Sequence, residues 1–123
     1  FFFFFEELMM LKQYNLPVKV FIINNSYLGM VRQWQELFHN KRYSSVDLSI
    51  NPDFIKIGEA YGIKSIQLKN KKDLKRHLKK ILESDEPILV DCIVEKEENV
   101  YPMIPAGKDV SCLVGKRGVL EDE

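Results

Sequence analysis

The chain has 123 residues, of which 46% are hydrophobic, so it is long enough for one globular domain with a sizeable core. Eighteen basic residues balance eighteen acidic ones, and this zero formal charge gives no overall field that would attract nucleic acid or an anionic membrane surface. Cys92 and Cys112 are too few for a zinc site, and we expect Cys92 to be a reduced, buried thiol in a cytoplasmic protein.

The amino terminus departs from any regular pattern. Phe1 to Phe5 match neither helical nor strand periodicity and would expose a large apolar patch. We interpret the first ten residues as a truncated terminus, with a buried hydrophobic segment as the alternative. Glu6 and Glu7 interrupt the apolar run far short of the roughly twenty residues that a membrane span requires, so no membrane anchor is expected. A helix is predicted from Glu6 to about Tyr14.

A buried strand is expected next. The run Val18–Ile23 is β-branched and aromatic, follows Pro17, and is apolar apart from Lys19. Such a run predicts burial on both faces, as in a parallel sheet. Asn24 and Asn25 follow it directly, and the carboxyl ends of strands are where open α/β sheets bind ligands.

The Asn pair allows two interpretations. An Asn amide oxygen is a neutral, hard ligand suited to Mg²⁺, and a backbone carbonyl in the following turn can supply a second oxygen, with phosphate oxygens completing the shell. Ordinary turn chemistry at the end of a strand also explains Asn24-Asn25-Ser26, and on composition alone it is the favoured interpretation.

An amphipathic helix is predicted after this turn, because apolar residues recur at positions i, i+4, i+7 and i+8. These residues are Met30, Trp34, Leu37 and Phe38, and the polar face between them holds Arg32, Gln33, Gln35 and Glu36. The spacing alone favours packing of Met30 and Trp34 in a core.

The second half of the chain alternates helices and strands. Residues 41–49 lack regular apolar spacing and are expected to form a loop. Asn51-Pro52-Asp53 then supplies an N-cap, a proline and an acidic first turn for a helix that ends at Gly62 in a left-handed cap. A short strand is predicted at Lys64–Leu68 and a buried strand at Ile88–Val94. This order predicts an α/β fold, a doubly wound parallel sheet flanked by helices.

The segment Lys69–Lys80 is strongly basic, yet apolar residues repeat at helical spacing through it. These are Leu74, Leu78, Ile81 and Leu82. We therefore interpret the charges as the solvated face of a helix and not as a phosphate-binding patch. His39 and His77 have no Ser, Cys or paired carboxylate at a nucleophile spacing, so both are predicted to be surface residues. The scattered single glycines exclude a Walker or dinucleotide-binding loop.

Several segments of the chain match, in order, those of a known family. They are Tyr14–Lys19, Ile23–Gln35, Phe38, Arg42–Ser44, Asn51–Phe54, Glu59–Lys64 and Asn99–Pro105. Together they resemble the large, catalytic subunit of acetolactate synthase (acetohydroxyacid synthase), and they are far more specific than the Asn pair alone. The resemblance implies a partial cofactor-binding domain at residues 1–107 and leaves 108–123 as a tail of unknown role.

The resemblance implies a thiamine-diphosphate enzyme, with this chain as the C-terminal domain that holds the cofactor's diphosphate through Mg²⁺. It implies that Asn25 is a side-chain metal ligand and that Tyr27 ligates through its backbone carbonyl. Leu28, Gly29 and Met30 complete the implied cofactor-binding residues. The family's Gly-Asp-Gly motif, which supplies the carboxylate ligand, does not occur in these residues and is expected upstream, so the fragment alone is expected to be inactive.

The resemblance also implies a substrate pocket, formed by Met30, Trp34 and Phe38 around the second 2-keto acid. No catalytic residue is expected in this fragment, because the family's activating glutamate comes from a different domain across a dimer interface. The implied reaction decarboxylates pyruvate and condenses the two-carbon unit with pyruvate or 2-ketobutyrate, in branched-chain amino-acid biosynthesis. The family also binds FAD, through a middle domain outside this chain.

The implied assembly is a homodimer or homotetramer of full-length chains, with a regulatory small subunit as a further partner and with neither nucleic acid nor a membrane. Two alternatives stay open. One is another thiamine-diphosphate carboligase or decarboxylase, such as a glyoxylate carboligase, although Trp34 with Gln33 and Gln35 favours the synthase. The other is a non-catalytic binding module that keeps the fold.

Overall fold

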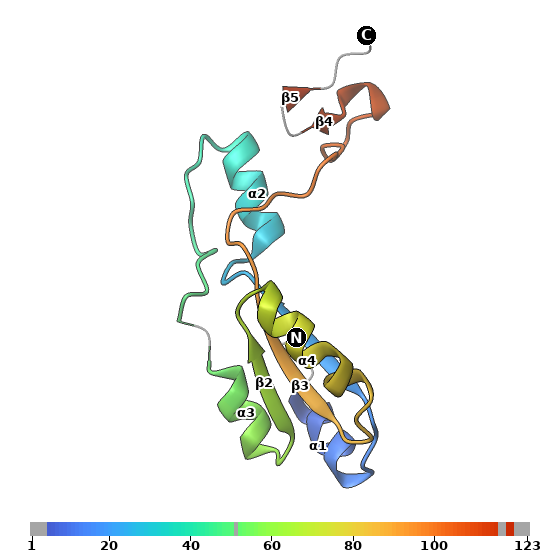
Figure 1. Ribbon diagram of the computed structural model, residues 1–123. Helices are drawn as coiled ribbons and strands as arrows, with labels where there is room; N and C mark the ends of the chain where they lie inside the picture. Colours follow the sequence, from blue (N-terminus) through green and yellow to red (C-terminus); the bar gives the residue numbers. More distant parts are fainter. Residues whose placement is uncertain (1–4, 51, 116–117, 120–123) are drawn as a thin grey trace. The chain divides into compact units, whose positions relative to one another are not determined.

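The computed structural model describes residues 5–50, 52–115 and 118–119 (Figure 1). The chain divides into two compact units. We call Phe1–Tyr27 with Asp47–Lys96 the sheet unit, and Leu28–Val46 with Glu97–Glu123 the α2 unit. The boundary at residue 107 came from family resemblance and stays a prediction. The expectations for Phe1 to Phe4 and for Asn51 lie outside the described residues.

The sheet unit is built on three parallel strands, β1 (Lys19–Asn24), β2 (Lys64–Leu68) and β3 (Ile88–Ile93). Their order in the sheet is β1-β3-β2, so the last strand of the three lies in the centre. Asp91 of β3 lies opposite Ile22 on one side and Gln67 on the other. The predicted parallel sheet is confirmed, and each strand lies within one residue of its predicted bounds.

Helices cover both faces of this sheet, as the doubly wound arrangement requires. α1 (Phe5–Gln13) and α3 (Phe54–Ala60) pack on one face, and α4 (Lys71–Leu82) packs on the other (Figure 1). The first cluster contains Leu8, Ile22, Phe54, Ile63 and Leu89, and the second contains Leu68, Ile81, Ile88 and Val90. Because side chains alternate across a strand, β3 contributes to both clusters and is buried on both faces, as predicted.

β1 was predicted to be buried on both faces, and this prediction is wrong for the described structure. Ile22 is buried with the α1 and α3 cluster, but Phe21 is 37% exposed and Ile23 is 68% exposed. Phe21 lies opposite Val90, on the face that carries α4. The α4 cluster draws on β2 and β3 only, so this face of the edge strand β1 is left uncovered.

Lys19, the one charged residue of the β1 run, joins the amino ends of β1 and β3. Its ammonium group donates hydrogen bonds to three backbone carbonyls, those of Pro17 at 2.8 Å, Ser84 at 2.5 Å and Glu86 at 2.9 Å. An ammonium has three donors and no acceptor, so these carbonyls use its full bonding capacity. The lysine therefore stabilises strand pairing without facing the core.

α3 begins with a different cap from the predicted one. The N-cap is Asp53, which was expected in the first turn, and its Oδ1 accepts from the amides of Ile55 and Lys56 at 3.0 and 3.2 Å. Asp caps a helix as well as Asn does, and Asp53 stands next to the first helical residue. The predicted left-handed cap is confirmed, because Gly62 has a φ of +69°.

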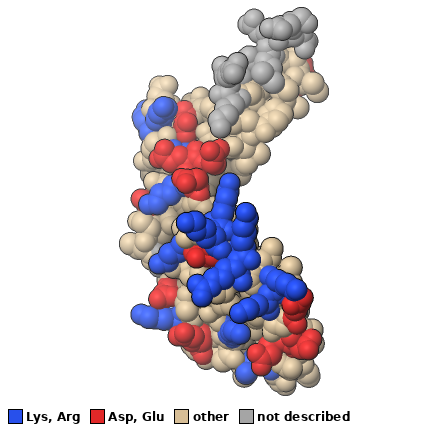
Figure 2. Space-filling view, viewed as in Figure 1, with Lys and Arg blue, Asp and Glu red and all other residues tan. Residues whose placement is uncertain are grey.

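α4 carries its basic residues toward solvent, as predicted. Figure 2 shows Lys and Arg side chains gathered over this helix. Its N-cap is Asn70, whose Oδ1 accepts from the amides of Lys72 and Asp73. Ile81 takes the core position, whereas Leu82, which was expected on the apolar face, is 58% exposed. Adjacent helical residues lie about 100° apart, so these two cannot share a narrow core contact.

The α2 unit contains α2 (Gly29–Phe38), which matches the predicted helix, and the segment from Glu97 onward. In that segment η2 (Val110–Cys112) precedes an antiparallel pair, β4 (Val114–Gly115) and β5 (Gly118–Val119). Within the described ranges, no helix has the length and apolar character needed to cross a membrane.

Candidate functional site

The turn after β1 is closed by the side chains of Asn24 and Asn25. Asn24 Oδ1 accepts a hydrogen bond from the Ser26 amide at 3.0 Å, and Asn25 Oδ1 accepts one from the Tyr27 amide at 3.1 Å. Ser26 lies in the left-handed region, with a φ of +58°. The turn interpretation of the Asn pair is thus confirmed. Metal binding stays compatible with it, because a carboxamide oxygen has two lone pairs.

A buried carboxylate anchors this turn to the central strand. Asp91 is 3% exposed, and its Oδ1 accepts from Asn24 Nδ2 at 3.0 Å while its Oδ2 accepts from Gln67 Nε2 at 2.9 Å. Asn24, Asp91 and Gln67, one side chain from each strand, therefore meet near the carboxyl end of the sheet. Neither Asp91 nor Gln67 was predicted as a site residue from the sequence. The available signal was an acidic residue inside an otherwise apolar strand.

A cleft of about 420 Å³ opens at this end of the sheet unit. Its polar lining consists of Asn24, Ser26, Ser49, Asp53, Gln67 and Asp91. Amide, hydroxyl and carboxylate groups all face it, so the cleft suits a hydrophilic ligand or ordered water. Within the described part of the chain, no group of three or more His, Cys, Asp or Glu side chains could hold a metal ion.

The backbone beyond the turn is held by the loop before α3. Tyr27 forms an isolated antiparallel bridge with Asp47, and the Leu48 amide donates to the Ser26 carbonyl at 2.8 Å. Hydrogen bonds from the Ser49 side chain and amide hold the pKa of Asp47 below its ordinary value. Backbone pairing thus fixes the position of Tyr27, which suits a role that its carbonyl, and not its side chain, would play.

α2 buries polar residues and exposes apolar ones, the reverse of the predicted pattern. Its buried residues are Arg32 and Gln33, and Gln33 is only 1% exposed. Met30 and Trp34 are 46% and 47% exposed, so the core packing that their spacing favoured is wrong for this unit. Leu28, Val31 and Phe38 are exposed as well.

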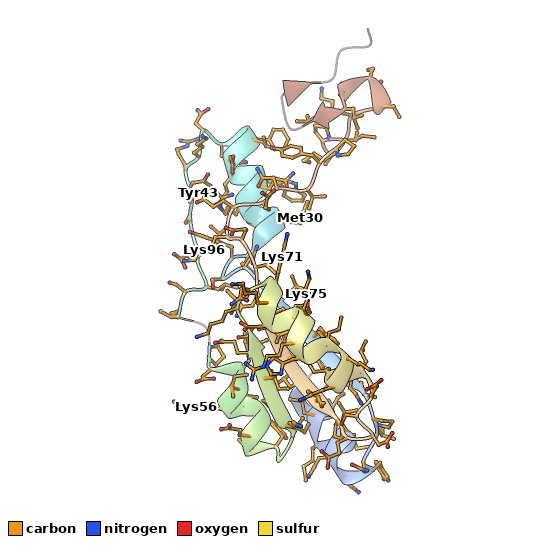
Figure 3. The ribbon with its side chains drawn as sticks, viewed as in Figure 1. Met30, Tyr43, Lys56, Lys71, Lys75 and Lys96 are labelled. Atoms are coloured by element: carbon orange, nitrogen blue, oxygen red, sulfur yellow. The ribbon has the colours of Figure 1, made fainter. Side chains whose placement is uncertain are left out.

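Arg32 is buried with two acidic partners, one on α2 itself and one on the segment from Glu97 onward. Its guanidinium forms ion pairs with Glu36 at 2.9 Å and with Glu97 at 3.4 Å. The same guanidinium lies over the Tyr43 ring, 5.0 Å from its centroid. Figure 3 shows Tyr43 and Met30 on opposite sides of α2. Burial raises the pKa of Tyr43, and the Arg32 charge opposes that rise.

Gln33 and Gln35 both pair with backbone as a peptide group would. Gln33 donates to the Val100 carbonyl at 2.9 Å and accepts from the Val100 amide at 2.7 Å. Gln35 makes the same pair of bonds with Ser44, at 3.0 and 3.1 Å. These contacts hold the two flanking segments against α2. They explain why a helix with an apolar stripe turns its polar side inward here.

Two clefts of about 500 and 410 Å³ open in the α2 unit. The first is lined by Val31, Trp34, Gln35, His39 and Arg42, and the second by Trp34, Phe38, His39, Pro105, Ala106 and Lys108. Trp34 borders both, which fits contact with a ligand better than core packing. Met30 borders neither of them. His39 is exposed, as predicted, and it too borders both clefts.

The remaining predicted site residues lie where the chain enters the helix. Gly29 is the first residue of α2, and Leu28 before it supplies no side-chain cap. Cys92, predicted to be a buried thiol, is free and partly buried beside the α4 cluster. Burial, with a smaller contribution from the charge of Asp91, raises the pKa of its thiol.

The chain also matches known proteins. The model of the family "thiamine pyrophosphate enzyme, C-terminal TPP binding domain" matches residues 1–92. The chain is 44% identical over 111 residues to the acetolactate synthase large subunit of Cyanidium caldarium, and 45% identical over 118 residues to that of Lactococcus lactis subsp. lactis (strain IL1403). It is 42% identical over 102 residues to the mitochondrial acetolactate synthase of Schizosaccharomyces pombe.

These three matches cover 89%, 96% and 83% of this chain. They cover only 19%, 20% and 15% of the relatives, so the chain spans about a fifth or less of their length. The family match agrees with the parallel sheet and its flanking helices. The chain therefore belongs to the thiamine pyrophosphate enzyme family, through the C-terminal domain that binds this cofactor.

Proposed function

We propose that the chain is the cofactor-binding segment of an acetolactate synthase large subunit. Such an enzyme decarboxylates pyruvate and joins the two-carbon unit to a second 2-keto acid, pyruvate or 2-ketobutyrate, in branched-chain amino-acid biosynthesis. The observation that carries the proposal is the turn Asn24 to Tyr27 at the carboxyl end of a parallel strand. The identity of 42–45% to acetolactate synthases supports it.

Mg²⁺ is the metal that this turn suits. Asn25 Oδ1 accepts one hydrogen bond and keeps a second lone pair, and the Tyr27 carbonyl is another neutral oxygen donor. Mg²⁺ in proteins is bound by few protein ligands together with substrate phosphates, which matches such a donor set. The carboxylate of a Gly-Asp-Gly motif is not among these 123 residues. Leu28 and Gly29 follow the turn, and glycine permits close approach of a diphosphate.

When bound, thiamine pyrophosphate supplies the electron sink for decarboxylation, while the protein binds, orients and excludes water. In this proposal Asn25 and Tyr27 hold the metal, and Met30, Trp34 and Phe38 contact cofactor and second substrate. The exposure of Trp34 and Phe38 at the 410 Å³ cleft supports that role. Apolar surface there would favour the extra methylene of 2-ketobutyrate by about 0.8 kcal/mol.

The proposal extends to the whole enzyme through the resemblance to acetolactate synthase large subunits. It includes FAD bound outside this segment, a homodimer or homotetramer of full-length chains, and a regulatory small subunit. A cytoplasmic location is part of it, and the two free cysteines are compatible with a reducing compartment.

The metal role is tested by grafting this chain into the Lactococcus lactis large subunit in place of the 118 matching residues. Isothermal titration with Mg²⁺ and thiamine pyrophosphate is then compared for the graft, its Asn25→Ala variant and its Asn99→Ala variant. We expect Asn25→Ala to weaken Mg²⁺ binding by more than the roughly 10-fold that loss of an outer-shell partner costs, and Asn99→Ala to leave it unchanged. Equal binding by Asn25→Ala and the parent graft would refute the assignment and favour a non-catalytic module.

The substrate role is tested in the same graft with Trp34→Leu. We expect a lower preference for 2-ketobutyrate over pyruvate in competition assays of product ratio, because the large rigid surface is lost. Tyr14→Leu serves as the matched control, since Tyr14 is an exposed aromatic residue in the sheet unit. An unchanged product ratio in Trp34→Leu would remove Trp34 from the pocket and reopen the alternative of another carboligase.

A further inference from the structure

Asp91 is a carboxylate in a buried, largely apolar part of the sheet unit. It lies on the central strand, on the same face as Ile22 and Leu89 of the α1 and α3 cluster, and is almost fully buried. Burying a charge is unfavourable unless hydrogen bonds compensate it, and buried ionic groups are weak evidence for stability. The two amides bonded to Asp91 come from the two neighbouring strands. Its place in the fold thus points to orientation of those amides.

The bond to Asn24 determines how that amide is used. Asn24 has one donor group and one acceptor group on its side chain. Because Asp91 takes the Nδ2 donor at 3.0 Å, the Oδ1 acceptor is directed to the Ser26 amide, also at 3.0 Å. A rotation of the Asn24 amide by half a turn would lose both bonds at once. The carboxylate therefore selects a single orientation of the Asn24 side chain.

The orientation of the Asn24 amide also affects the position of Asn25. The Asn24 turn and the Asn25 turn overlap at Ser26, whose left-handed backbone joins them. Fixing the Ser26 amide fixes the peptide that carries Asn25, and the Asn25 side chain is then set by its own bond to Tyr27. The chain of contacts runs from β3 through Asn24 to the oxygen of Asn25.

We propose that Asp91 is a positioning residue for the metal-binding turn, acting through Asn24. This inference rests on the proposed metal role of Asn25 and extends it to a residue on another strand. The bond to Gln67 plays no part in it. Gln67 is exposed and lies on the opposite side of Asp91 from the turn, so water can replace its amide.

Three variants separate orientation from charge. Asp91→Leu removes the acceptor for Asn24. Asp91→Asn removes the charge but keeps an oxygen for Asn24, because the exposed Gln67 amide can rotate to accept from the new amide group. Gln67→Leu removes the other hydrogen bond and leaves the one to Asn24 in place. Asp91→Leu therefore affects the Asn24 turn, Asp91→Asn affects only the charge, and Gln67→Leu affects only the contact with β2.

The test uses the graft in the Lactococcus lactis large subunit and isothermal titration of Mg²⁺ in the presence of thiamine pyrophosphate. We expect Asp91→Leu to weaken Mg²⁺ binding by about 10-fold or more, the size of effect that outer-shell partners of metal ligands have. Asp91→Asn and Gln67→Leu should stay within about threefold of the parent, below that range. Asp91→Leu binding within the same limit, or Asp91→Asn as impaired as Asp91→Leu, would overturn the inference.

Asn24→Ala provides a second approach that leaves position 91 unchanged. Thermal melting of each variant reports whether it is folded. Asn24→Ala removes the other end of the same bond and should weaken Mg²⁺ binding to a similar extent, whereas unchanged binding would overturn the inference. The Asn25→Ala graft separates the two proposals. If Asn25→Ala binds normally, the proposed metal site fails. If Asn25→Ala is impaired while Asn24→Ala is normal, only the role of Asp91 fails.

Discussion

Burial should set how much two glutamines of α2 contribute to stability, since both pair with backbone in the same way while Gln33 also donates to Met103 Sδ. Gln33 and Gln35 each form one donor and one acceptor bond with a single backbone residue, Val100 or Ser44. Gln33 is 1% exposed, whereas the bonds of Gln35 lie at the surface. Replacing each glutamine by leucine gives a matched pair of changes on one helix. We expect them to differ because the Gln33 bonds are part-buried and the Gln35 bonds are exposed, so water replaces the Gln35 bonds more readily.

The magnitude for Gln33→Leu follows from the groups left without partners. The Val100 amide and carbonyl would each lose a part-buried hydrogen bond to the buried Gln33 side chain, at about 1–3 kcal/mol apiece. Burial of the leucine side chain returns part of this, about 1.5–3 kcal/mol at most. We therefore expect a net loss of about 1–3 kcal/mol for Gln33→Leu, against about 0.5–1 kcal/mol for Gln35→Leu.

Amide hydrogen exchange measures this loss at the residue concerned. The exchange of the Val100 amide should rise by about 5- to 150-fold in Gln33→Leu, since 1.4 kcal/mol corresponds to tenfold. The Ser44 amide should change by less than about fivefold in Gln35→Leu. Mass spectrometry of peptides containing Val100 or Ser44, from the grafted enzyme, reports both. Equal increases in the two peptides would refute the argument that burial sets the difference.

Three further changes test contacts in the sheet unit. Lys19→Met should lower the free energy of unfolding by about 1.5–3 kcal/mol, because three carbonyls lose a charged donor; an unchanged urea midpoint would contradict this. Asp53→Ala should destabilise α3 by about 0.5–2 kcal/mol while Asp53→Asn does not, and equal melting temperatures would show that the cap is dispensable. Burial and the Asp91 charge raise the pKa of Cys92, so its thiolate fraction at pH 8 is low. Asp91→Asn should therefore speed alkylation of Cys92 by iodoacetamide, and a slower reaction would contradict the stated effect of the Asp91 charge.

The parts of the fold that the sequence predicted well are those set by local patterns. The bounds of β2 and the left-handed cap at Gly62 depend on residues close together in the chain, and both are confirmed. β3 was recognised because a central strand is apolar on both faces. The prediction for β1 is wrong among the described residues, because an apolar run does not reveal which elements cover each face of its strand.

The candidate site divides in the same way. The turn at Asn25 and Tyr27 follows from neighbouring residues, so the sequence could predict its geometry. Asp91 acts on Asn24 across 67 positions, and Gln33 bonds to Val100 across the same separation. No periodicity within a helix or strand reports such a partner. The burial of Gln33 and the role of Asp91 therefore required the structure.

The inverted burial of α2 also bears on what its apolar residues do. An amide side chain carries one donor and one acceptor group, so it can pair with backbone and be buried without an unfavourable loss of hydrogen bonds. Gln33 pairs in this way with the backbone of Val100 and holds that segment against α2. Trp34 and Phe38 are exposed and do not pack in the core. Large exposed apolar side chains beside a cleft mark a binding surface more often than a packing defect. This arrangement supports the proposed function, in which α2 is held by its polar side and presents Trp34 and Phe38 to a ligand.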